Sequence, residues 1–233
     1  ASHMLGAVYG MERIMGQDKT PVRAVFDYAA YHFLNHLPIY YLLTVTTAPG
    51  GDICLHGLFS GKDRQCFEEA VALAQQKNLT LIEQPIQKAV VYLDPQEFKS
   101  TWLGNKAIYR TRMAIADRGE LIILAPGISK FGEDQAVDAL IRKYGYTGRE
   151  NILSQSQSQQ DLKQNLSAAA HLIHGSSDGR FKVTYCTQHL SQKEVESVGY
   201  NYIPLNDALA AFPPEKLNDG FNILPNGDRK SVV

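Results

Sequence analysis

The chain contains little cysteine, and its cysteines form no recognisable framework. Only Cys54, Cys66 and Cys186 occur among the 233 residues. An odd and sparse set of this kind is typical of a reducing compartment and not of a disulfide scaffold. There is no CxxC pair, so the sequence gives no support for a structural zinc site. We therefore expect a cytoplasmic protein without disulfide bonds.

Long apolar runs and an excess of charge of one sign are also missing. The richest apolar stretch, residues 39–48, is about ten residues long, which is too short to cross a bilayer. There are 23 basic and 24 acidic side chains, so charge gives no reason to expect nucleic acid or an acidic membrane as a partner. Residues 1–4 resemble the remnant of a cleaved expression tag, and we treat residues 5–233 as a single domain.

Glycine-rich phosphate motifs are absent too. The sequence contains no GxGxxG and no GxxxxGK[ST]. It therefore lacks the dinucleotide-binding fingerprint and the P-loop.

What the sequence does contain is an alternation of strand and helix patterns. Residues 22–37 have helical spacing after Thr20 and Pro21, which can cap and open a helix. Residues 39–47 and 53–59 favour a hairpin. Strand, helix, strand and helix patterns then follow over residues 88–145. We predict an α/β fold with a mixed, largely parallel sheet covered by helices and an N-terminal β-hairpin segment.

A long helix is predicted over residues 97–117, ending at Gly119 as a left-handed cap. At 100° per residue, one stripe of this helix carries Lys99, Leu103, Lys106 and Arg110. The adjacent stripe carries Phe98, Trp102, Tyr109 and Met113. A cationic row beside an aromatic row suits a ligand that bears a carboxylate. The alternative is that the cations line a solvated edge and the aromatic rings belong to the core.

Two further features could carry chemistry. Asp94 follows the carboxyl end of a predicted strand, where open α/β sheets bind ligands, although Asp94 could equally cap the next helix. His171 and His174 are three residues apart, a spacing that can ligate a metal. With no third ligand at a telling distance, packing at a helix end is the competing interpretation.

These residues resemble the C-terminal half of the nickel-pincer lactate racemase family. Gly16–Arg23 is similar to the Gly-Asn-Pro-Val-Arg segment that opens that half. The following segments keep the family's order: a strand that ends in Phe59–Gly61, a helix that carries Lys106, and the run Gly119–Ala125. Trp102–Lys106 stands where the family has Tyr-Gln-x-x-Lys, whose aromatic residue and lysine reach the substrate. Lys106 matches this motif, Trp102 matches only as an aromatic residue, and the glutamine is replaced by leucine.

The resemblance implies the C-terminal domain of a 2-hydroxyacid racemase or epimerase, an isomerase that uses a nickel-pincer nucleotide. The family's nickel ligand, cofactor-attached lysine and proton-shuttling histidines belong to an N-terminal half, so we expect this chain alone to bind no cofactor and to be inactive. Its partners would be that N-terminal domain and a hydroxyacid substrate. The candidate substrate-binding residues are Asp94, Lys99, Trp102, Asn105, Lys106 and Arg110.

The changed motif further suggests a sugar acid, such as gluconate or mannonate epimerised at C2, in place of lactate. Two alternatives remain open from the sequence. One is a non-catalytic α/β module that binds a sugar acid or another small anion. The other is an interaction domain whose cationic stripe meets an acidic partner.

Overall fold

The computed structural model describes residues 2–48, 51–216, 220–223 and 229–232. The chain divides into two compact units, and we describe each by itself. The smaller unit is formed by residues 13–83, and the larger by residues 3–12 together with the chain from residue 84 onward. The single domain expected over residues 5–233 stays a prediction, because compact units need not fold independently. No helix in the described part is long and apolar enough to cross a membrane.

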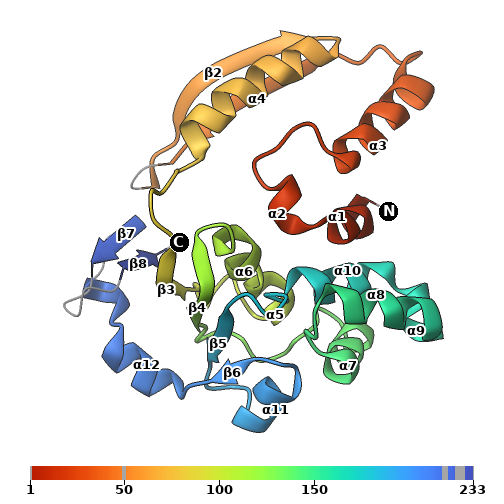
Figure 1. Ribbon diagram of the computed structural model, residues 1–233. Coiled ribbons are helices and arrows are strands. Elements are labelled where there is room, and N and C mark those ends of the chain that lie inside the picture. Colours follow the sequence, from red (N-terminus) through yellow and green to blue (C-terminus); the bar gives the residue numbers. More distant parts are fainter. Residues whose placement is uncertain (1, 49–50, 217–219, 224–228, 233) are drawn as a thin grey trace. The chain divides into compact units, whose positions relative to one another are not determined.

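The smaller unit contains the predicted hairpin. Strands β1 (Tyr41–Thr47) and β2 (Cys54–Gly61) pair antiparallel, and helix α4 (Arg64–Asn78) packs along them (Figure 1). Helix α3 (Pro21–Ala29) begins as predicted, because the Thr20 side chain accepts a hydrogen bond from the Arg23 amide at 3.2 Å. It is shorter than predicted and continues as a π-helical turn, η1 (Ala30–Leu34).

The larger unit is built on a four-stranded sheet with the order β3-β4-β5-β6. Its strands are β3 (Ile86–Tyr92), β4 (Ile115–Leu124), β5 (Lys182–Cys186) and β6 (Asn201–Tyr202). All neighbouring strands in this sheet are parallel. Strands β7 (Gly220–Ile223) and β8 (Arg229–Val232) form a separate antiparallel pair. The predicted fold class is therefore confirmed.

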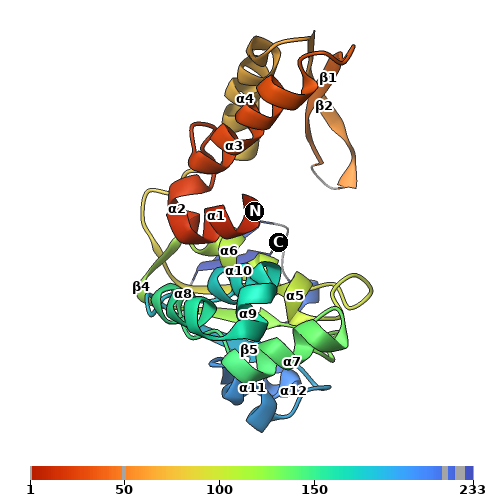
Figure 2. The same cartoon turned by 90° about the vertical axis from the view of Figure 1, so that its right-hand side faces the viewer.

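Helices cover both faces of this sheet. Besides α3 and α4, the described α-helices are α1 (Ser2–Tyr9), α2 (Met11–Ile14), α5 (Thr101–Gly104), α6 (Lys106–Thr111), α7 (Gln135–Tyr144), α8 (Arg149–Ser158), α9 (Gln160–Gln164), α10 (Leu166–His174), α11 (Gln192–Ser197) and α12 (Leu205–Ala211). Alternate β5 residues point to opposite faces. Tyr185 reaches α5 and α6 through Asn105, whereas Cys186 packs with Leu205 and Ala208 of α12. Figure 2 shows α8, α9 and α10 side by side.

The predicted long helix over residues 97–117 is wrong. Helical backbone covers only α5 and α6, with a break at Asn105, and β4 already begins at Ile115. The residue with a left-handed backbone is Arg118 (φ 64°) and not Gly119, so no helix ends there. The apolar residues keep a helical spacing beyond Thr111, where α6 ends. The chain instead enters a strand because Ile115 pairs with Ile86, and a local sequence pattern does not reveal such a long-range contact.

Two further segments differ from what their composition suggests. The apolar run 79–82 forms no strand, and Leu81 within it is 92% exposed. Most of the polar Ser/Gln tract at residues 154–160 belongs to α8, whose Ile152 is fully buried. Burial of this one apolar anchor holds an otherwise polar helix in place.

Candidate functional site

The candidate site lies where α5 meets α10 in the larger unit. The Ser100 side chain caps α5 by accepting a hydrogen bond from the Leu103 amide at 3.4 Å. Trp102 follows in the first turn and is half-buried. Its ring stacks on the ring of His171 in α10, with centroids 4.2 Å apart and planes 26° apart. A partly accessible indole is thus held in a fixed orientation by a buried histidine.

The orientation of His171 is fixed by a chain of hydrogen bonds. The Thr101 hydroxyl donates to the Phe131 carbonyl oxygen at 3.0 Å. Its single proton is then used, so it accepts from the Tyr146 hydroxyl at 2.9 Å. By the same count, Tyr146 accepts from Nε2 of His171 at 2.9 Å. His171 therefore carries its proton on Nε2, which leaves Nδ1 as the acceptor.

This histidine is neutral at physiological pH. Burial, with smaller contributions from His174 and His3, lowers the pKa of His171 to about 3. Burial also lowers the pKa of His174 to about 4. The spacing of His171 and His174 is visible in the sequence, but nothing in the local pattern connects His171 to Trp102.

Asn105 lies beneath the site and not on its surface. It is 1% exposed, and its side-chain oxygen accepts from the Tyr185 hydroxyl at 2.6 Å. Its side-chain nitrogen has no hydrogen-bond partner among the described residues. Tyr146 and Tyr185 both stack on Tyr200 below, with centroids 4.5 Å and 5.0 Å from its ring. From the sequence we expected Asn105 to contact a ligand directly. A side chain this deeply buried is not accessible to one from the surface.

The predicted cationic stripe is only partly present. Lys106 is half-buried and Arg110 is exposed, one turn apart on α6. Within the described ranges neither charged group makes an ion pair or a side-chain hydrogen bond. Lys99 precedes α5, is exposed, and donates to the Pro95 carbonyl oxygen. Lys99 is thus outside the helical stripe, whereas the two cations of α6 belong to it.

Asp94 follows the carboxyl end of β3, as predicted, and is exposed there. Its carboxylate accepts from the Gln96 amide at 2.7 Å, and its carbonyl accepts from Phe98. These bonds are those of a residue that caps a turn, the competing interpretation from the sequence.

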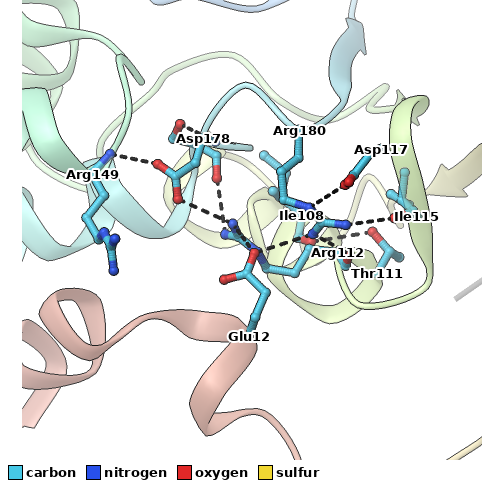
Figure 3. A network of polar contacts seen from close by, with 10 residues as sticks. Glu12, Ile108, Thr111, Arg112, Ile115, Asp117, Arg149, Asp178 and Arg180 are labelled. Atoms are coloured by element: carbon cyan, nitrogen blue, oxygen red, sulfur yellow. Dashed lines mark hydrogen bonds and ion pairs between the residues drawn. The ribbon is translucent and has the colours of Figure 1, made fainter.

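Arg112, the residue after α6, joins the elements that carry the site (Figure 3). It is 1% exposed, and it donates to Glu12 at 2.6 Å and to the Ser176 carbonyl at 3.1 Å. Asp178 lies 3.5 Å from the same guanidinium. The network therefore ties the end of α6, the loop after α10 and the helix α2 together within the larger unit.

Metal ligation has no geometric support in the described part of the chain. No group of three or more His, Cys, Asp or Glu side chains there could hold a metal ion. The Nε2 atom of His174 has no hydrogen-bond partner in this part of the structure. On α10, His171 is the one other histidine that could share a metal ion with it, and two ligands are too few.

Two solved structures are similar to this chain. A protein from Thermotoga maritima matches 97% of this chain and 57% of its own, with a TM-score of 0.71 and 21% identity. The lactate racemase apoprotein from Thermoanaerobacterium thermosaccharolyticum matches 100% of this chain and 52% of its own, with a TM-score of 0.64 and 14% identity. The chain thus spans little more than half the length of either structure.

Sequence comparisons add no family assignment. No protein-family model matches the chain. No curated protein matches it either. At identities of 21% and 14%, the structural likenesses show a shared fold, and that fold is the one found in a lactate racemase apoprotein.

Proposed function

We propose that this chain is the C-terminal part of a lactate racemase-like enzyme that racemises or epimerises a 2-hydroxyacid, and that it forms one wall of the substrate cleft. The observation that carries this proposal is the match of the whole chain to about half of a lactate racemase apoprotein. This match concerns the fold of the whole chain and not the short sequence motifs that carry the resemblance.

Lys106 is the residue proposed to bind the substrate carboxylate. A lysine ammonium donates strong charge-assisted hydrogen bonds to a carboxylate, and the half-buried position of Lys106 limits screening by water. Arg110 lies one turn further along α6 and offers a second, more exposed cation. The partly exposed Trp102 ring, which stacks on His171, is the apolar surface proposed to pack against the carbon skeleton of the substrate.

The resemblance places the nickel-pincer nucleotide and its ligands in an N-terminal half, and the described residues of this chain contain no cluster of three or more metal-ligating side chains. We therefore assign no step to nickel here. In the proposed enzyme this chain binds and orients the hydroxyacid, and the chemistry at the α-carbon belongs to the remainder of the protein.

Exposed apolar side chains in the smaller unit support further protein as a partner. They include Phe26 (51%), Tyr28 (61%), Tyr31 (68%), Phe33 (63%), Leu42 (68%) and Leu58 (63%). Apolar exposure on this scale is typical of surfaces that other protein covers. The matched structures contain additional chain of nearly the same length, and we propose that the corresponding N-terminal domain packs here.

For the substrate we propose a sugar acid, such as gluconate or mannonate, in preference to lactate. The broad face of Trp102 suits the C–H face of a polyhydroxylated chain, and Arg110 adds donors for hydroxyl groups. Because Asn105 is sealed beneath the site, the proposed donors are reduced to Lys106 and Arg110. This part of the proposal depends mainly on the ring of Trp102.

Fluorescence provides a direct test, because Trp102 is the single tryptophan of the chain. We expect gluconate to change its emission saturably, with a weaker response to lactate. Lys106→Ala should lower the affinity by about 2–4 kcal/mol, the cost of losing a charge-assisted bond to a carboxylate.

Lys77→Ala is the matched control, because Lys77 is an exposed lysine at the end of α4. It should bind as the unchanged chain does. Emission that none of these acids alters, or equal affinities for the Lys106→Ala and Lys77→Ala proteins, would remove Lys106 and Trp102 from the site.

A further inference from the structure

A cavity lies at the edge of the main sheet where β5 and β6 begin. Its volume is about 420 Å³, within the usual range of about 300–1,000 Å³ for small-molecule pockets. It is lined by the first residues of β5 and β6, Lys182 and Asn201, and by Arg118 of β4. Asp94 follows the carboxyl end of β3, whereas this cavity opens at the amino ends of β5 and β6.

The lining of the cavity is cationic. Arg118, Arg180 and Lys182 contribute three positive charges, and no aspartate or glutamate lines the cavity. Arg180 is already engaged, because it donates to Asp117 at 2.9 Å and to the carbonyl oxygen of Ile115 at 3.0 Å (Figure 3). Arg118 and Lys182 are exposed, and their side chains make no ion pair or hydrogen bond within the described ranges. Two cations are therefore free to bind an anion in a chain whose formal net charge is −1.

The cavity also gathers unusual backbone and neutral donors. Arg118 (φ 64°) and Asp178 (φ 51°) are the non-glycine residues with positive φ in the described chain. Arg118 lines the cavity, and Asp178 lies in the loop between Ser177 and Gly179, which also line it. Strained backbone of this kind persists where the surroundings hold it, and it concentrates at functional sites. The Ser177 hydroxyl adds a neutral donor.

We propose that this cavity binds a small phosphomonoester, with Arg118 and Lys182 pairing with the phosphoryl oxygens and Ser177 donating to them. A dianion suits two free cations better than a monocarboxylate does. The volume exceeds what a phosphate group needs, so the ligand has an organic body, which rests against the buried rings of Tyr146 and Tyr200. This site is distinct from the proposed hydroxyacid site and does not depend on it.

The test is calorimetric titration of the full chain with glycerol 3-phosphate and with inorganic phosphate, each at constant ionic strength set with chloride. We expect one saturable site for both probes and none for acetate. Lys182→Gln should weaken binding about 10-fold or more, as expected for a lost charge-assisted bond. Arg118→Gly should do the same and also raise the melting temperature, because glycine adopts a positive φ without strain.

Lys193→Gln is the matched control, because Lys193 is an exposed lysine of α11 outside the cavity. It should leave phosphate affinity unchanged. The proposal is overturned if neither phosphate probe binds, if acetate binds as well as phosphate, or if Lys182→Gln binds phosphate as the unchanged chain does.

Discussion

At the scale of single residues, a neutral histidine determines how the tryptophan of the candidate site is held. His171 is buried, carries its proton on Nε2, and stacks on Trp102 at 4.2 Å. A charged imidazolium in the same place would be penalised by burial, which is why the pKa of His171 falls to about 3. The ring of Trp102 therefore keeps one environment over the range in which free histidine titrates.

This histidine should make stability depend on pH. Its pKa is lower in the folded chain than the ordinary value of about 6.5, so the folded state favours the neutral form. Its contribution to stability is then complete above pH 6.5 and declines as the pH falls toward 3. We expect His171→Phe, which keeps an aromatic ring against Trp102, to reduce the loss of stability between pH 7 and pH 5.

Denaturant unfolding at both pH values measures this effect, with tryptophan emission as the probe. His189→Phe is the control, because His189 is an exposed histidine. The assignment fails if the two variants show the same pH dependence of stability.

A second prediction at this scale concerns the contact between the buried Arg112 and Glu12. Burial alone would raise the pKa of Glu12, but its backbone hydrogen bond and the guanidiniums of Arg112 and Arg180 outweigh burial and lower it. A lowered carboxyl pKa contributes stability above pH of about 4.5 that is lost as the pH falls below that value. Glu12→Gln should cost about 1–3 kcal/mol at pH 7 and less at pH 3.5, because it leaves Arg112 partly uncompensated.

Unfolding free energies at the two pH values test this expectation. Glu97→Gln, at an exposed glutamate, should have little effect at either pH. A Glu12→Gln penalty that is equal at pH 7 and pH 3.5 would show that the ion pair is not its cause.

At the scale of elements, close backbone contact shapes the carboxyl edge of the sheet. Gly127 follows β4 and lies against the loop that follows β3. A Cβ atom added there would lie 2.6 Å from the Pro95 carbonyl oxygen and 2.8 Å from that of Phe98. Both neighbours are backbone atoms and cannot move as a side chain does. The two loops thus approach closely only because residue 127 has no side chain.

Gly127→Ala should therefore destabilise the chain by about 1–3 kcal/mol, as overpacking commonly does. Ser129→Ala, at an exposed position of the same loop, should stay within about 0.5 kcal/mol of the unchanged chain. Chemical denaturation of the three proteins measures both values. Equal stability of the two variants would contradict the close packing of these loops.

Local signals in the sequence were sufficient for many elements. The hairpin predicted over residues 39–47 and 53–59 is present as β1 and β2, and Thr20 caps the start of α3 as expected. The helix over residues 97–117 failed because the strand pairing of Ile115 depends on distant residues. For the same reason the sequence placed Trp102 and Lys106 on a helix but could not place His171 against Trp102.

At the scale of the whole molecule, the chain has a fold that it shares with a longer solved protein. Its larger unit presents Lys106, Arg110 and Trp102 beside a tightly bonded network, and its described residues hold no metal-ligand group. Its length corresponds to 52% of the lactate racemase apoprotein that it matches. We therefore propose the activity for a longer protein, to which this chain would contribute one part.

The most direct test of this proposal is turnover by the complete, cofactor-loaded protein. We predict that it interconverts gluconate and mannonate at C2, followed by proton NMR, with a higher kcat/KM than for racemisation of lactate. A site that offers donors for hydroxyl groups should discriminate against a substrate that lacks them. A complete protein that binds these acids and converts none of them would contradict the proposed enzyme, and a higher kcat/KM for lactate would contradict the proposed substrate.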